Sequence, residues 1–203
     1  MAQTAMEKRH DYLTKTPVHK LICILSVPTI ISMMVTNLYN MADTFFVGRI
    51  STQATAAVGI VLPFMNVIQA VGFFCGHGSG NYVSRKLGAG EIREAEEMAS
   101  TGFSLAFLLG LIMLGAGLVN LTVLATALGA TDTIIKDTND YLRIILIGTP
   151  FMTSQLVINN QLRYQGAAFY AMLGLVSGAV LNIFLDPLLI FTFNLGVSGA
   201  ALA

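Results

Sequence analysis

The chain has 203 residues, of which 55% are hydrophobic and 11% are charged, and its mean hydropathy is +0.72. Soluble domains carry about 25% charged residues, so the composition indicates a membrane protein that crosses the bilayer several times. The formal net charge is zero and the basic residues are scattered. Nucleic acid is therefore not an expected partner.

The first twenty residues are polar and mixed in charge, and an apolar run follows them. This run has no small-residue cleavage site behind it, as a removed signal peptide would have. We therefore expect residues 1–20 to form a cytoplasmic N-terminal segment and the apolar run to be a retained first span.

A membrane-spanning helix needs about 20 mostly apolar residues, and five segments meet this criterion. A final short segment, GVSGAALA, is typical of the opening of a sixth helix. The predicted fold class is an all-α polytopic membrane protein. Its expected spans are residues 21–46, 55–84, 98–128, 141–162 and 168–193, followed by the start of a sixth helix in 196–203.

The connection between the second and third spans, residues 85–97, is rich in charge. It is expected to be a short surface helix or an extension of the third span. Basic residues favour the cytoplasmic side of a membrane, and most of them fall inside if the N-terminus is cytoplasmic. The inner set is then Lys8, Arg9, Lys15, Lys20, Arg85, Lys86, Arg93 and Arg163, and the outer set is Arg49, Lys136 and Arg143.

Glycines at four-residue spacing recur in two spans. One set is Gly72, Gly76 and Gly80, and the other is Gly174 and Gly178. Small residues at this spacing allow helices to approach closely, so both sets predict helix contacts.

Asp186 lies inside an otherwise uncharged apolar run, residues 164–195. A carboxylate at this depth is costly and is seldom kept without a function or a partner. Asn182 is four residues earlier, on the same helix face. Pro187 follows directly and would leave the carbonyl of Ile183 without its helical donor. The run is thus predicted to carry a small polar site.

Asp43 lies near the outer end of the first span, with Tyr39 and Asn40 on the same face. Since the first and fifth spans run in the same direction, Asp43, Asn182 and Asp186 are expected at similar depth. Two neighbouring carboxylates in a low dielectric cannot comfortably both ionise, so the pair could bind H⁺. Oxygen ligands also suit a hard cation such as Na⁺, and the choice of ion stays open.

Simpler roles remain for each of these polar residues. Asp43 could be hydrated at the headgroups or paired with Arg49, and Asn182 could form a hydrogen bond between helices. Gln69 could line a cavity or join helices, and Asn159 and Asn160 could lie at the membrane interface.

Five segments together resemble the multidrug and toxic compound extrusion (MATE) family, in its bacterial drug-efflux branch. One of them, LGVSGAALA (195–203), resembles the start of its helix six. Residues 16–48 resemble its first helix, and GSGNYVSRKLGAGEIREAEEMA (78–99) resembles its loop between helices two and three. LRYQG (162–166) resembles the turn before helix five, and LNIFLDPLLIF (181–191) resembles helix five itself.

This resemblance implies a six-helix lobe that is normally followed by a second, similar lobe. Residues 21–203 would be the N-terminal lobe, with helix six incomplete and the C-terminal lobe missing. The family exports amphipathic, often cationic, drugs across the bacterial cell membrane in exchange for H⁺ or Na⁺, without another cofactor or metal. By motif match, the cation site is Asp43, Asn182 and Asp186, and the cavity is lined by Tyr39, Asn40, Gln69, Asn159 and Asn160.

Other functions fit the sequence less well. A lipid-linked glycan flippase of the same superfamily would need basic residues in its cavity, whereas Arg143 and Arg163 lie at span ends. An intramembrane aspartyl protease would carry its aspartates in Tyr-Asp and Gly-x-Gly-Asp contexts, and here they follow Ala42 and Leu185. A channel would need polar stripes along several spans. No enzyme activity is therefore expected.

Overall fold

A computed structural model describes residues 16–203, and the regular structure in that range is entirely helical. The N-terminal segment before residue 16, with Lys8, Arg9 and Lys15, lies outside the described residues. Five helices are long and apolar enough to cross a membrane. The elements in order are α2 (Val18–Gly48), α3 (Thr52–Gly88), α4 (Ile92–Val119), α5 (Leu121–Ala127), α6 (Ile135–Tyr164), α7 (Ala168–Pro187), the π-helix η1 (Leu188–Thr192) and α8 (Val197–Leu202).

The five predicted spans and the start of a sixth helix are confirmed, with two refinements at the third span. Its helix α4 begins at Ile92, so residues 92–97 of the charged connection extend the third span, whereas residues 85–88 belong to the end of α3. The expected single helix to residue 128 is wrong, because it is interrupted at Asn120. The Asn120 side-chain amide donates to the Ala116 carbonyl over 3.1 Å, and such side-chain bonds compete with helical geometry.

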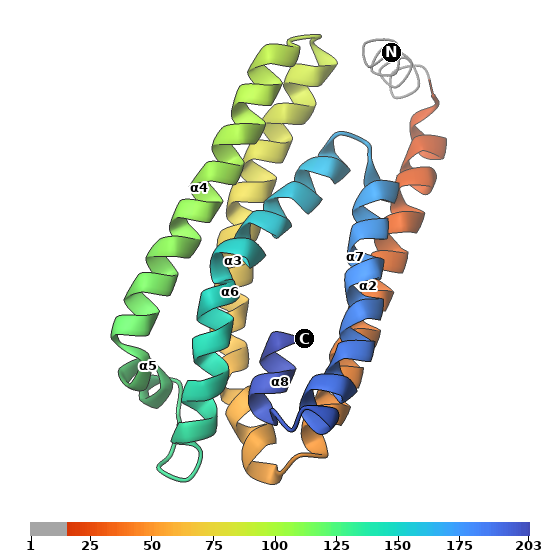
Figure 1. The fold of residues 1–203 in the computed structure, drawn as a ribbon. Coiled ribbons are helices and arrows are strands. Elements are labelled where there is room, and N and C mark those ends of the chain that lie inside the picture. The colour runs from red at the N-terminus through yellow and green to blue at the C-terminus, as the bar shows by residue number, and fades with distance from the viewer. Residues whose placement is uncertain (1–15) are drawn as a thin grey trace.

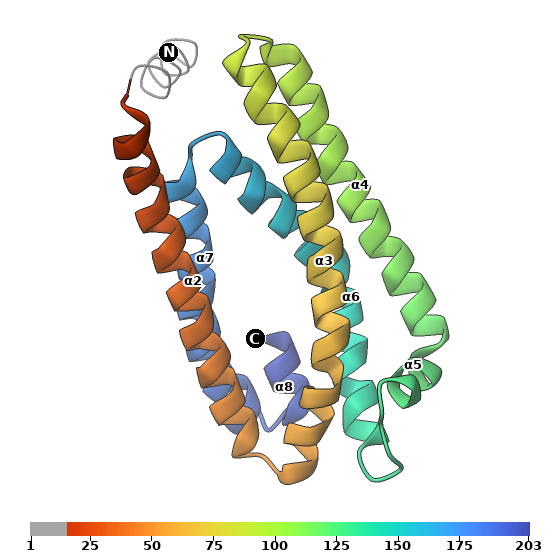
Figure 2. The ribbon, with the colours of Figure 1, turned by 180° about the vertical axis from the view of Figure 1, so that it is seen from behind.

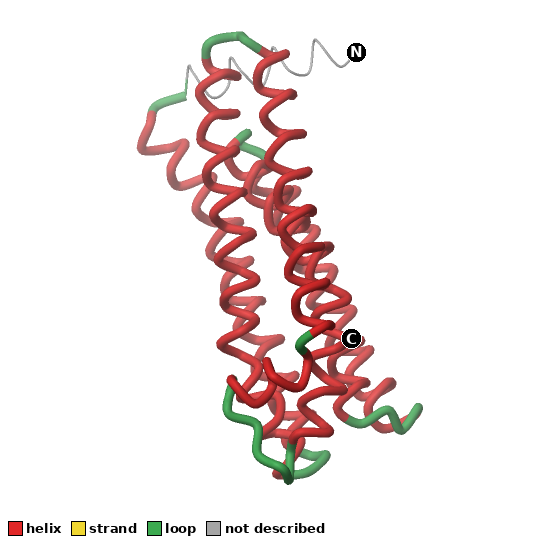
Figure 3. Tube along the Cα trace, turned by 90° about the vertical axis from the view of Figure 1, so that its left-hand side faces the viewer, coloured by secondary structure: helices red, strands yellow, loops and turns green. Residues whose placement is uncertain are grey.

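The helices form two groups that face each other across the molecule. Helices α3, α4 and α6 pack together on one side, and α2 and α7 run side by side on the other (Figures 1 and 2). The short α8 lies between the groups, near the end where α2 joins α3. The loops gather at the two ends of the elongated bundle (Figure 3).

Close approach of α3 to α6 depends on the glycines of α3. A Cβ at Gly72 would lie 2.7 Å from Leu156 Cδ1, and one at Gly76 would lie 3.0 Å from the Asn160 amide. The contact predicted from the first glycine set is thus confirmed. The prediction for Gly174 and Gly178 is wrong, because no atom would lie within 4 Å of a Cβ at either position.

A buried hydrogen-bond network ties the same three helices together. The Gln161 amide of α6 donates to Ser79 Oγ of α3 and to the Ala99 carbonyl of α4, each over 3.0 Å. Thr153 Oγ1 donates to the Ala106 carbonyl over 2.9 Å. Hydrogen bonds between helices and close glycine contacts are the main sources of helix association in lipid, so α3, α4 and α6 form a firmly connected unit.

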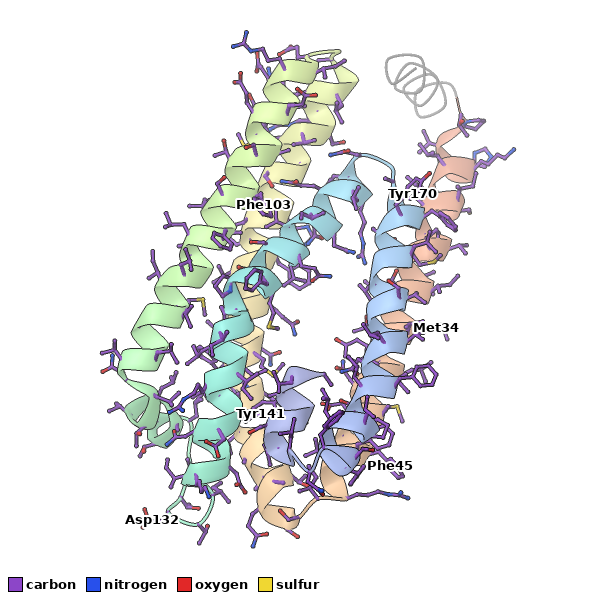
Figure 4. All side chains as sticks on the ribbon, viewed as in Figure 1. Met34, Phe45, Phe103, Asp132, Tyr141 and Tyr170 are labelled. Atoms are coloured by element: carbon purple, nitrogen blue, oxygen red, sulfur yellow. The ribbon has the colours of Figure 1, made fainter. Side chains whose placement is uncertain are left out.

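The outer surface is apolar, as the bilayer requires. Met34, Phe45 and Tyr170 are 61%, 55% and 65% exposed, and Figure 4 labels them on α2 and α7. The exposed side chains of α2 and α7 therefore suit contact with lipid.

Candidate cation site

The two intramembrane aspartates sit on neighbouring helices. Asp43 is half-buried in the last turns of α2, and Asp186 is completely buried at the end of α7. Because α2 and α7 pack along their length (Figure 1), the two side chains come to the same region. Asp186 is near enough to Asp43 to feel its charge, and a joint role of the two carboxyl groups in binding a cation stays a prediction.

Pro187 sets the geometry around Asp186. The α-helix ends at Pro187, and the chain continues as the π-helix η1. Phe193 N–H donates to the Leu188 carbonyl over 3.0 Å, a wider turn than an α-helix makes. Proline cannot donate to the carbonyl one turn earlier, and π-helical turns are frequent at functional sites. Asp186 therefore lies at a junction in the backbone.

Several buried oxygens at this junction have no hydrogen-bond partner among residues 16–203. They are both carboxylate oxygens of Asp186 and Oδ1 of Asn182. An unsatisfied buried acceptor costs about 1–3 kcal/mol, and more when it is charged. A proton on the carboxylate or a hard cation among these oxygens would remove this cost, so the donor set fits either ion.

Two tyrosines complete the surroundings of the aspartates. The Tyr141 phenol, on α6 (Figure 4), interacts electrostatically with both Asp43 and Asp186. Its hydroxyl also contacts Met65 Sδ at 3.9 Å, and the residue is 4% exposed. Tyr39 is half-buried on α2 and interacts with Asp43. Residues of α2, α6 and α7 therefore form the site.

The sequence analysis included Tyr39 but overlooked Tyr141. A signal for Tyr141 was present, because the fourth span runs from the outer to the inner side in the predicted orientation. Its first residue, Tyr141, therefore has the same expected depth as Asp43 and Asp186. Tyrosines at span ends are usually attributed to the membrane interface, so a position beside the aspartates is easily overlooked.

Arg49 does not neutralise Asp43. Its guanidinium carbon lies 4.4 Å from the centroid of the Phe45 ring. Among residues 16–203, no ion pair joins Arg49 to Asp43. The pairing considered from the sequence is therefore not found, and the site keeps two acidic groups without a basic partner.

The other predicted cavity residues are either exposed or hydrogen-bonded within the bundle. Asn40 and Gln69 are exposed on α2 and α3. Asn159 donates to the Ala171 carbonyl of α7 over 3.0 Å, and the buried Asn160 donates to the Leu156 carbonyl over 2.8 Å. These two asparagines have structural partners, and a substrate-lining role for all four stays a prediction.

Comparison with known proteins gives one consistent family. The MatE family model matches residues 28–188. The multidrug export protein MepA of Staphylococcus aureus (strain MRSA252) is 31% identical over 192 residues, which is 94% of this chain and 43% of MepA. The chain thus spans less than half the length of this relative.

Solved structures agree with the sequence match. An outward-facing multidrug resistance MATE transporter superposes with a TM-score of 0.89 at 34% identity, over 94% of this chain and 42% of that one. A MOP superfamily transporter from Pyrococcus furiosus, described as having a binding pocket of reversed polarity that suggests a different function, gives 0.85 at 34% identity. That match covers 90% of this chain and 40% of the transporter.

Proposed function

Since this chain belongs to the MatE family, we propose that it is the N-terminal lobe of a cation-coupled multidrug exporter. The complete transporter would export amphipathic, often cationic, compounds while H⁺ or Na⁺ enters the cell. One observation supports the proposal most strongly: within the described part of the chain, both carboxylate oxygens of the buried Asp186 lack a hydrogen-bond partner, and a second carboxylate is near.

The coupling ion binds at Asp43 and Asp186. Two close carboxylates repel each other, and this repulsion is strong where water is excluded. A bound H⁺ or Na⁺ relieves it and also satisfies the orphaned oxygens of Asp186 and Asn182. The Tyr141 phenol on α6 interacts electrostatically with both carboxyl groups. The repulsion between the two carboxylates is present in the empty site and absent in the ion-bound site, so the two states favour different arrangements of the helices.

The architecture suggests how ion binding is transmitted. The aspartates belong to the α2–α7 pair, whereas α3, α4 and α6 are fastened by the Gln161 network and the glycine contacts. Ion binding shifts α2 and α7 against this fixed unit. A ligand moves such an equilibrium only by its differential affinity for the two states, so drug and ion favour opposite states and are exchanged.

The remaining assignments follow from this scheme. Tyr39, Asn40, Gln69, Asn159 and Asn160 line the drug path, which a second lobe completes. The protein lies in the bacterial cell membrane, surrounded by lipid, with its N-terminus in the cytoplasm.

The test is ethidium efflux from cells that express the full-length protein encoded by the source gene. Wild type is compared with Asp43→Asn and Asp186→Asn at matched expression, with the pH and Na⁺ gradients collapsed separately. The control is Asp132→Asn, in the exposed outer loop. Loss of efflux in the first two variants supports the proposal, and the effective gradient identifies the ion. Wild-type efflux in both variants would refute the coupling role.

A further inference from the structure

A second polar feature lies on the inner half of α3, away from the aspartates. It is a shallow, open groove of about 590 Å³, lined by residues of the C-terminal half of α3 and by Tyr164, near the end of α6. The aspartate site lies at the other end of the bundle, where α2 joins α3. Figure 2 shows α3 along its full length between these two ends. The groove is therefore separate from the proposed cation site.

One wall of the groove is a fixed aromatic cluster. The Phe73 ring stacks on the His77 ring, with centroids 5.5 Å apart and an interplanar angle of 18°. The Tyr164 ring meets His77 edge-on, and its hydroxyl lies 3.2 Å from His77 Nδ1. Phe74 stands at the edge and is 76% exposed. The deeper part of the groove thus offers flat apolar surface.

The polarity of the groove changes steadily along α3. Phe73, His77, Asn81 and Arg85 follow each other at four-residue spacing, which places them on one helix face. The stripe runs from apolar through polar to charged toward the end of the helix. At 1.5 Å per residue it extends about 18 Å, comparable to a lipid headgroup together with the upper part of an acyl chain.

Arg85 is the uncompensated charge of this surface. The neighbouring Lys86 pairs with both Glu91 and Glu94. In contrast, no ion pair involves Arg85 within residues 16–203, and no carboxylate lines the groove there. The matching ligand is therefore an amphiphile with an anionic head.

We propose that this groove binds one anionic phospholipid of the cytoplasmic leaflet. Its phosphate contacts Arg85 and Asn81, and an acyl chain lies along Phe73 and Phe74. The leaflet follows from the proposed orientation, which places the end of α3 in the cytoplasm, where anionic lipids face basic residues near the membrane surface. Lipid occupancy would link α3 to the Tyr164 end of α6.

The test measures lipid retention by the purified full-length protein in detergent, using native mass spectrometry. Dioleoyl phosphatidylglycerol is compared with dioleoyl phosphatidylcholine. Wild type should retain the anionic lipid preferentially, and Arg85→Gln should reduce that preference about tenfold, the effect of one charged hydrogen bond. Arg93→Gln is the matched control, because Arg93 is on the same side of the membrane but pairs with Glu97.

Further arms distinguish the alternatives. Arg85→Lys should keep most of the preference, which separates lost charge from misfolding. Excess inorganic phosphate should not displace the lipid; displacement would indicate a simple anion site and overturn the proposal. Equal losses of lipid preference in Arg85→Gln and Arg93→Gln would overturn the proposal too. So would a wild-type protein that retains no lipid, which is the result expected if a second lobe covers the groove. Transport is not measured, so failure of the exporter function would leave these outcomes unchanged.

Discussion

The carboxyl groups of Asp43 and Asp186 lie close enough to interact electrostatically, although one belongs to the first long helix and the other to the last. Asp186 is completely buried, and neither of its carboxylate oxygens has a hydrogen-bond partner among the residues that the structure describes. No positive side chain relieves this arrangement within the described part of the chain, so a mobile cation is the natural counter-charge.

The first prediction concerns stabilisation by the coupling ion. A ligand that binds only the folded state stabilises it by RT ln(1 + [L]/Kd), so saturating Na⁺, or lowering the pH if H⁺ is the ion, should raise the Tm of the full-length protein. Asp186→Asn should abolish this dependence, because it removes the charge that binds the ion. The measurement is thermal unfolding in detergent across Na⁺ and pH series. An unchanged ion dependence in the variant would place the ion elsewhere.

The second prediction concerns Tyr141. Tyr141→Phe removes the hydroxyl of a phenol that interacts electrostatically with both aspartates. The loss of one polar interaction costs about 0.5–1.5 kcal/mol, so the apparent affinity for the coupling ion should weaken by up to about tenfold. The ion concentration for half-maximal ethidium efflux measures this. Tyr170→Phe, on the exposed face of α7, should leave that concentration unchanged. If both variants need the same ion concentration as wild type, the Tyr141 hydroxyl does not contribute to ion binding and the residue serves only in packing.

The third prediction tests helix packing through α4. A Cβ at Gly110 would lie 2.5 Å from the backbone Cα of Pro150, which cannot move aside as a side chain can. Gly110→Ala should therefore destabilise the protein by about 1–3 kcal/mol. Gly115→Ala on the same helix meets nothing within 4 Å and should be neutral or slightly stabilising. Both variants add one methyl group to a glycine of α4. Their thermal unfolding therefore separates the effect of the close contact with Pro150 from the effect of alanine on helix propensity.

The fourth prediction concerns the polar network of α3, α4 and α6. Gln161→Leu removes both interhelical hydrogen bonds and should destabilise the protein by about 1–3 kcal/mol. Ser79 keeps its own bond to the Cys75 carbonyl, so the loss falls on the contacts between helices. Gln155→Leu, exposed on α6, is the control. Equal unfolding temperatures for the two variants would show that the network contributes little.

The sequence predicted the features that depend on hydrophobicity and helix direction. The spans follow from apolar length alone, and the meeting of Asp43 with Asp186 follows from two helices that run the same way. In contrast, the break at Asn120 depends on a local side-chain bond that competes with a good apolar pattern. Gly72 and Gly174 have the same motif, but only Gly72 meets a neighbouring helix. Which face meets a partner depends on the assembled bundle.

The pairing of α2 with α7 has a consequence for how the protein is made. Helix α2 enters the membrane first, yet its main neighbour is the last long helix of the chain. Contacts so distant in sequence form late. During synthesis, α2 must therefore wait in the bilayer with Asp43 uncovered while α3, α4 and α6 assemble. The arrival of α7 brings the two aspartates together, so the proposed ion site can form only after all five long helices of the described chain are in the membrane.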